Sequence, residues 1–197
     1  MKQIVLASNN KGKINEIKKV FKNYDVLSIS DMEKILNKKL IVTENCDTFR
    51  KNALEKATTL YNQIGDEYLC VGDDSGISID ILNGFPGVYT ARWLDKDDHT
   101  KNLELLKKLK GVLKEERTCH YTTVIALKGK DITKTFEYTL DGIISNMPRG
   151  KNGFGFDEIF ELPNGLTLGE LTLEEKLKVS PRKRTLDMVE KYIKDKQ

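Results

Sequence analysis

The sequence predicts an α/β fold with a mixed β-sheet. An apolar run of strand length at residues 3–7 is followed by a turn and then by apolar positions with helical spacing. Later in the chain, strand-like segments at residues 118–127 and 132–140 are joined by a short turn, as in an antiparallel pair. Strand–helix alternation followed by such a pair favours a sheet that contains both pairing directions.

The other elements follow from periodicity and capping signals. Asp47 or Thr48 is expected to cap a long helix that Gly65 ends. A last helix is expected to start at Pro181, with Ser180 as its N-cap. The remaining predictions are a first helix containing residues 14–21, short strands at residues 25–29, 68–71 and 77–81, a helix at residues 100–109 and a loop-rich segment at residues 142–169.

Length and composition exclude several classes of protein. The chain has 197 residues, a formal net charge of +3 and 32% charged residues, which suits a globular domain with a substantial core. No apolar run approaches the roughly 18 residues of a transmembrane helix, and the first run turns polar too early for a secretory signal. We therefore expect a cytoplasmic protein that does not enter a membrane. The three cysteines and two histidines lack the spacing of a disulfide framework, a zinc site or a histidine-based triad, so any catalysis must rest on other groups.

The charge is unevenly distributed along the chain. Residues 1–39 carry a net +5, residues 174–197 carry +3, and the middle carries −5. These charges are either solvated surface groups, or basic ends and an acidic middle that converge on an anionic ligand and a cation. Composition alone does not decide between the two.

The first candidate site is the turn SNNKGK at residues 8–13. A strand–turn–helix places backbone N–H groups where they favour an anion, and Ser8, Asn10 and Lys13 add donors and a charge. The alternative is an ordinary capped turn with solvated lysines.

The second candidate is the acidic segment GDDSG at residues 72–76. Adjacent side chains on a strand point to opposite faces, so Asp73 and Asp74 are expected to do different jobs. Carboxylates suit Mg²⁺, whereas a polar turn is the alternative interpretation. Glu44 precedes the long helix, and Lys56 lies at the edge of that helix's apolar stripe, where it either extends to water or reaches an anion.

Two further segments carry candidate binding residues. Phe154 and Phe156 alternate with glycines before Asp157, and such a loop either stacks a ring on a nucleobase or plugs the core with its rings. Arg182 falls in the first turn of the predicted last helix, which is unfavourable for a cation and therefore indicates a ligand or a buried carboxylate. The basic run at residues 182–184 is too short to support a nucleic-acid-binding motif.

Four motifs occur in order along the chain: ASNNKGKINEI, TENCDTFRKNALEKA, GDDSGISIDILNGFPGVYTARW, and GFGFDEIF with EEKLKVSPR. Together they resemble the inosine triphosphate pyrophosphatase family, also called Ham1-like, from residue 4 to about residue 186. The resemblance implies an elongated α/β fold of two lobes around a long mixed sheet with a central substrate cleft, as one domain over residues 1–197 without a linker. It also implies a homodimer that hydrolyses ITP, dITP and XTP to the monophosphate and pyrophosphate, which cleans the nucleotide pool of non-standard purines.

The resemblance also implies roles for individual residues. Glu44 and Asp74 match ligands of Mg²⁺, and Asp74 also matches the proton acceptor. The residues that match contacts to the substrate are Ser8, Asn10, Lys13, Lys56, Ser75, Phe154, Gly155, Phe156, Asp157, Lys176, Ser180 and Arg182. Two positions depart from the family pattern, because Pro181 replaces a histidine substrate contact and Glu158 replaces a proline. Arg182 is expected to keep its place.

The expected reaction is attack of water at the α-phosphorus, with Asp74 as general base and Asp73 as the second choice. Two other functions compete with this prediction. One is a Maf-like pyrophosphatase that acts on pyrimidine or modified nucleotides. The other is a nucleotide- or nucleic-acid-binding module without catalysis, although no stable nucleic-acid complex is expected.

Overall fold

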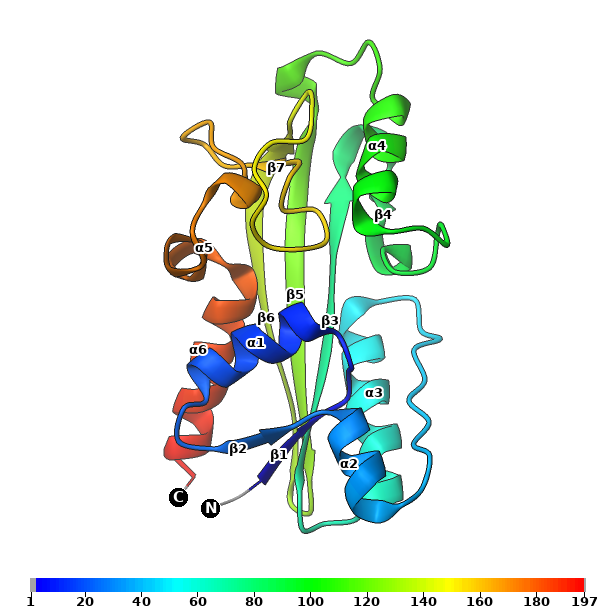
Figure 1. Cartoon of the computed structure of the whole chain (residues 1–197), viewed down its shortest axis with the longest axis vertical. Coiled ribbons are helices and arrows are strands. Elements are labelled where there is room, and N and C mark those ends of the chain that lie inside the picture. The colour runs from blue at the N-terminus through cyan, green and yellow to red at the C-terminus, as the bar shows by residue number, and fades with distance from the viewer. Residues whose placement is uncertain (1–2, 197) are drawn as a thin grey trace. The chain divides into compact units, whose positions relative to one another are not determined.

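The structure is a computed structural model that describes residues 3–196 of the chain. Within these residues, seven strands form one sheet (Figure 1). The strands are β1 (Gln3–Leu6), β2 (Asp25–Leu27), β3 (Leu69–Ile79), β4 (Phe85–Pro86), β5 (Thr118–Gly129), β6 (Ile132–Ile144) and β7 (Phe160–Glu161). The order is β2-β1-β3-β5-β6-β7, and β4 pairs with β3. β1 pairs in parallel with β2 and β3, whereas β4 and β7 pair antiparallel with β3 and β6, which confirms the predicted α/β fold with a mixed sheet.

Six α-helices and four short 3₁₀ turns accompany the strands within residues 3–196 (Figure 1). The helices are α1 (Lys11–Val20), α2 (Ile29–Leu36), α3 (Phe49–Ile64), α4 (Asp98–Lys108), α5 (Leu173–Val179) and α6 (Pro181–Lys194). The 3₁₀ turns are η1 (Asp80–Leu82), η2 (Gly87–Tyr89), η3 (Lys114–Glu116) and η4 (Leu168–Glu170). None of the helices in the described part of the chain has the length and apolar character needed to span a bilayer.

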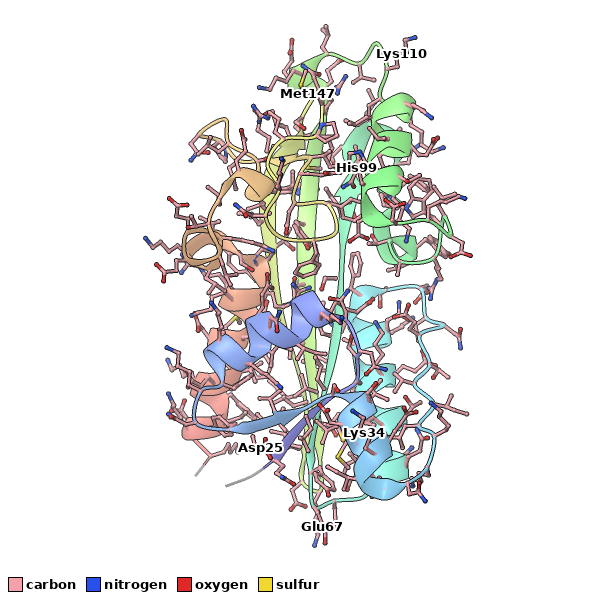
Figure 2. The ribbon with its side chains drawn as sticks, viewed as in Figure 1. Asp25, Lys34, Glu67, His99, Lys110 and Met147 are labelled. Atoms are coloured by element: carbon pink, nitrogen blue, oxygen red, sulfur yellow. The ribbon has the colours of Figure 1, made fainter. Side chains whose placement is uncertain are left out.

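The described chain divides into two compact units. Unit 1 comprises residues 3–74, 123–138 and 182–196, and unit 2 comprises residues 75–122 and 139–181. The boundaries fall inside β3, β5 and β6 and after the first residue of α6, so these elements contribute residues to both units. Each unit has a core of its own. Figure 2 draws the side chains around the strands. The core of unit 1 includes Ile4, Leu6, Ile17, Val71 and Leu186. The core of unit 2 includes Ile77, Leu105, Tyr121, Phe156 and Phe160.

The expected capping signals act at the ends of two helices. Thr48, rather than Asp47, is the N-cap of α3 and accepts a hydrogen bond from the Lys51 backbone N–H at 3.2 Å. Gly65 ends α3 with φ near 85°, a conformation that favours glycine. Pro181 is the first residue of α6, as predicted.

Two expectations about the elements are wrong. The segments expected as separate strands at residues 68–71 and 77–81 are one continuous strand, β3, so the acidic segment is not a turn. The strand expected at residues 25–29 ends at Leu27, because Ser28 forms a capping box with Asp31 and starts α2. α2 and α5 were not predicted, although Thr172 and Glu175 form a second capping box at the start of α5.

Candidate active site

A cluster of buried or half-buried charges lies within unit 1. Its members come from α1, the loop before α3, α3 itself, β3 and α6, and they are Lys13, Glu16, Glu44, Lys56, Asp73, Asp74 and Arg182. We call this set the charge cluster. It brings together residues that the sequence places in all four motifs.

Asp73 lies at the centre of one half of the charge cluster. Its carboxylate pairs with the Lys13 Nζ at 2.6 Å and with the Arg182 Nε at 2.7 Å. The Arg182 Nη1 pairs in turn with the Glu16 Oε2 at 2.6 Å. Burial alone would raise the pKa of Asp73, but the charges of Arg182 and Lys13 outweigh it and lower this pKa. Asp73 is therefore held as a carboxylate, and its oxygens are engaged in fixing the two cations.

Asp74 belongs to the other half of the charge cluster. The Lys56 Nζ lies 2.8 Å from the Asp74 Oδ1, and it also pairs with the Glu44 carboxylate. The Asp74 Oδ2 is buried and accepts no hydrogen bond from residues 3–196. Burial raises the pKa of Asp74, and the charge of Lys56 only partly opposes this shift. A carboxylate with a raised pKa and one free oxygen is suited to accept a proton.

The two neighbouring aspartates thus have opposite environments. Their side chains alternate across β3, so Asp73 faces Lys13 and Arg182 while Asp74 faces Lys56. Environments that push the pKa values of two adjacent acids apart are typical of a division of roles in catalysis. The expectation that they would do different jobs agrees with this geometry.

Lys56 reaches Asp74 because α3 lies unusually close to β3. A Cβ added at Gly72 would lie 1.9 Å from the Ala53 backbone oxygen, so only glycine allows this approach. Lys56 is 7% exposed. The alternative in which its amine extends to water is therefore wrong. Its burial would lower its pKa, but the Asp74 and Glu44 carboxylates outweigh this and raise the pKa.

The charge cluster fits a divalent cation at Glu44 and Asp74. Within residues 3–196, no group of three or more His, Cys, Asp or Glu side chains could hold a metal by itself. Mg²⁺ commonly uses only one or two protein carboxylates, with water and substrate phosphates as the other ligands. The buried Asp74 Oδ2 without a partner is the kind of oxygen such an ion would use.

The turn at residues 8–13 behaves as a capped helix start. Asn10 is the N-cap of α1 and accepts from the Lys13 backbone N–H at 3.0 Å, while the Ser8 hydroxyl accepts from the Asn10 N–H at 3.1 Å. Lys13 also donates to the Asp73 carbonyl oxygen, and burial lowers its pKa. Of the three expected phosphate contacts in this turn, only Lys13 joins the charge cluster.

A second group of site candidates lies within unit 2. The Lys176 Nζ pairs with the Asp157 Oδ2 at 2.7 Å and lies 4.5 Å from the centre of the Phe154 ring. The Phe154 backbone N–H donates to the same Asp157 oxygen at 2.8 Å. A Cβ at Gly153 would lie 2.0 Å from that oxygen, so glycine is required for this close approach. The aromatic loop, which we define as residues 153–157, is thus folded around the Asp157 carboxylate.

The other candidates from the last two motifs take different positions in unit 2. Phe156 is buried in the core of this unit, as the core-plugging alternative predicted, whereas Phe154 is half-buried. Ser180 is buried and ends α5, with its N–H donating to the Lys176 carbonyl at 2.7 Å. Ser75 follows Asp74 on β3 and is half-buried.

Sequence reasoning missed three residues that hold these groups. Glu16 pairs with Arg182 in unit 1, and Asp98 and Asn102 bond to the aromatic loop in unit 2. The helical spacing of these polar residues could have indicated them. Glu16 lies three residues after Lys13, and Asn102 lies four residues after Asp98, so the members of each pair share one helix face. Polar pairs with this spacing are common on exposed faces, so the signal is weak.

The fold and the charge cluster define an α/β protein in which lysines pair with carboxylates on a central strand. Comparison with known proteins identifies its family. A model of the Ham1 family matches residues 4–192. The dITP/XTP pyrophosphatase of a Thermoanaerobacter species is 39% identical over 196 residues, which cover 97% of this chain and 96% of that protein. The dITP/XTP pyrophosphatase of Staphylococcus epidermidis is 37% identical and covers 100% of this chain and 99% of that protein. The chain belongs to the Ham1 family.

Solved structures agree with this membership. The structure of the Staphylococcus aureus Ham1 protein has a TM-score of 0.86 and 33% identity, with full coverage of both chains. A HAM1 protein from Coxiella burnetii also gives a TM-score of 0.86, at 30% identity, with 99% of this chain and 100% of that chain covered. The family predicted from the four motifs is therefore confirmed, together with the α/β fold.

Proposed function

We propose that this protein is a nucleoside triphosphate pyrophosphohydrolase that converts dITP, ITP and XTP to the monophosphate and pyrophosphate. Relatives of nearly equal length are dITP/XTP pyrophosphatases. The observation that carries the proposal is Asp74, whose carboxylate is buried, has a raised pKa, and pairs with Lys56 through one oxygen while the other has no hydrogen-bond partner in residues 3–196. A hydrolase that activates water beside a polyphosphate needs this combination of a base and a nearby cation.

Glu44 and Asp74 are the residues that we propose to hold Mg²⁺. When bound, such an ion neutralises phosphate oxygens and stabilises the leaving pyrophosphate. Lys13 and Lys56 also neutralise phosphate oxygens. Their salt bridges with Asp73 and Asp74 hold their amines in place before the substrate arrives.

The chain's own part in the chemical step is proton acceptance and positioning. Water attacks the α-phosphorus, its proton passes to the Asp74 carboxylate, and the bond between the α-phosphorus and the bridging oxygen breaks to release pyrophosphate. The raised pKa of Asp74 favours its role as the acceptor, whereas Asp73 has a lowered pKa and oxygens already engaged by cations. We therefore propose Asp74, and not Asp73, as the general base.

The aromatic loop is proposed to recognise the base. Stacking of the Phe154 ring on a purine contributes ~1–3 kcal/mol, and the Asp157–Lys176 pair offers one acceptor and one donor beside it. Hypoxanthine and xanthine present a 6-oxo acceptor and an N1–H donor that match this pair. The 6-amino group of adenine would face the Lys176 amine donor to donor, which leaves both unpaired.

Further parts of the proposal rest on the resemblance of the motifs. They are a homodimer, a cytoplasmic location, one domain over the whole chain, substrate contacts by Ser8, Asn10, Gly155, Phe156, Ser180 and Ser75, and a base contact by Arg182. Arg182 binds two carboxylates in this structure through its Nε and Nη1 atoms, and the proposed base contact is additional to these.

A panel of nucleotides tests the activity. The purified protein is given inosine, xanthosine, adenosine, guanosine and pyrimidine triphosphates, with Mg²⁺ or with EDTA, and pyrophosphate and orthophosphate are measured separately. We expect pyrophosphate from inosine and xanthosine triphosphates, and none in EDTA. Release of orthophosphate alone would refute the proposed bond cleavage, and a preference for pyrimidines would favour a Maf-like activity.

The Asp74→Asn variant tests the general base in the same assay. The turnover should fall by at least about 10²–10⁴-fold because the carboxamide cannot accept the proton and is also a poorer ligand for the proposed Mg²⁺, while circular dichroism should be unchanged. Asp131→Asn, at an exposed acid on the turn between β5 and β6, is the matched control and should keep full activity. Near-normal turnover of Asp74→Asn would remove Asp74 from the catalytic role.

A further inference from the structure

The first turns of α4 hold the aromatic loop by its backbone. The Asp98 Oδ2 accepts a hydrogen bond from the Gly155 N–H at 2.7 Å, and the Asn102 Nδ2 donates to the Gly155 carbonyl oxygen at 2.8 Å. Both polar backbone groups of Gly155 are therefore bound by side chains four residues apart on one helix face. All of these residues belong to unit 2.

Two more contacts extend this arrangement past the loop. The Asn102 Nδ2 also donates to the Glu158 Oε1 at 2.9 Å, and the His99 Nδ1 lies 2.9 and 3.1 Å from the two Glu158 oxygens. Figure 2 labels His99 at α4. We call Asp98, His99, Asn102 and Glu158 the α4 clamp. Asn102 is fully buried, so it acts on the loop and not on a ligand.

The position of Gly155 explains what the α4 clamp controls. Gly155 separates Phe156, which is anchored in the core of unit 2, from Phe154, whose ring is half-buried under the Lys176 amine. Its φ of +64° is a conformation that most residues avoid. Fixing both its N–H and its carbonyl therefore fixes the direction in which the chain presents Phe154.

The α4 clamp also borders open space beside that ring. A hollow in unit 2 is lined by Phe154 and Asp157 of the loop together with Asp98, His99 and Glu158 of the clamp. The residues that hold the loop thus line the same hollow as Phe154. A change in the clamp would change both the wall and the orientation of Phe154.

We propose that Asp98 and Asn102 are positioning residues, which act through Gly155 to orient Phe154 for stacking on the purine base. The consequence for the substrate rests on the proposed function of the aromatic loop. The base lies away from the bond that breaks, and its contacts are the same in the ground state and in the transition state. Loss of the clamp should therefore raise KM and leave kcat nearly unchanged.

The test uses Asp98→Ala, because Asp98 is exposed and its loss leaves the core intact. Amide hydrogen exchange at Gly155 should accelerate about tenfold or more, since a hydrogen bond to a charged acceptor is lost. The KM for dITP should rise about tenfold, with kcat within about twofold of the wild-type value. Asp98→Asn retains an acceptor oxygen and should restore most of both properties.

Asp95→Ala is the matched control, because Asp95 is an exposed acid just before α4. It should leave both the exchange of Gly155 and the KM unchanged. Unaltered exchange at Gly155 in Asp98→Ala, or a fall in kcat at constant KM, overturns the proposal. A wild-type protein that releases no pyrophosphate from any nucleotide refutes the proposed function instead, while the exchange measurement still decides whether the clamp exists.

Discussion

Arg182 illustrates how a single residue can combine an unfavourable local position with a favourable tertiary one. It lies in the first turn of α6, where the helix dipole disfavours a cation. Two buried carboxylates, Asp73 and Glu16, compensate through contacts of 2.7 and 2.6 Å. The sequence left open whether a ligand or a buried carboxylate explains this arginine, and the structure shows the carboxylates.

This pairing predicts a large effect of Arg182→Ala on stability. Removing the guanidinium takes a buried cation away from both carboxylates, and only Asp73 keeps the Lys13 amine beside it, so the loss costs about 3–5 kcal/mol of the free energy of unfolding. Chemical denaturation followed by circular dichroism measures this change. Arg50→Ala serves as the control, because Arg50 forms a half-exposed pair with Glu137, whose loss should cost less than about 1 kcal/mol. Equal stabilities of the two variants would contradict a structural role of Arg182.

The adjacent aspartates show the limit of sequence reasoning at this scale. Strand alternation predicted that Asp73 and Asp74 would face different partners, and they do. The identity of each partner depends on α1, α3 and α6, which lie far away in the sequence. The opposite directions of the two pKa shifts could therefore be derived only from the folded chain.

At the scale of elements, the approach of α3 to β3 positions the catalytic candidates. The absence of a Cβ at Gly72 allows the Ala53 carbonyl to lie against the strand, and Lys56, one turn further along α3, reaches Asp74 as a result. The acidic segment therefore continues the strand instead of forming the expected turn. Polar and glycine-rich composition is typical of turns, but here the two carboxylates are paired with buried cations within the strand.

Gly72→Ala tests this packing. The new methyl group would lie 1.9 Å from a backbone oxygen, so α3 must move away from β3. We expect a loss of roughly 1–3 kcal/mol in the free energy of unfolding, measured by urea denaturation, together with a lower turnover because Lys56 is displaced from Asp74. Gly129→Ala is the matched control, since its Cβ would meet its nearest neighbour at an ordinary 3.5 Å. A Gly72→Ala protein as stable and active as this control would show that the close approach is not needed.

The two helices that the sequence analysis did not predict have a common cause. α2 and α5 have 8 and 7 residues, and each begins with a capping box rather than with a long apolar stripe. Periodicity over so few residues is a weak signal. Among the longer elements, α1, α3, α4, α6, β5 and β6 carry full periodic patterns and were predicted, whereas the 11-residue β3 was predicted as two separate strands.

For the whole molecule, part of the uneven charge of the sequence forms internal pairs. Lys13 from the basic first segment and Arg182 from the basic tail both bind Asp73 from the acidic middle. These cations neutralise buried carboxylates and do not add to a basic surface. These residues from the ends and the middle do come together, as partners of one another. Their convergence on an anionic ligand and a cation stays a prediction.

This internal pairing predicts weak binding to polynucleotides. Non-specific binders with exposed basic surfaces have Kd values of about 10⁻⁴–10⁻⁶ M at physiological salt. Fluorescence anisotropy of a labelled single-stranded oligonucleotide should show no binding up to about 10 µM protein at about 0.15 M salt. Binding in this range with a steep salt dependence would support the alternative of a nucleic-acid-binding module.

The sequence by itself determined the family, the α/β class, most of the long elements and the residue types available for chemistry. These properties depend on local periodicity, on capping residues and on motifs that are contiguous in the chain. The tertiary structure decided which charges meet, because partners such as Lys13, Asp73 and Arg182 are separated by many residues and only packing of the helices on the strands brings them within 3 Å. It also revealed the α4 clamp, since the bonds from Asp98 and Asn102 to Gly155 join segments more than 50 residues apart.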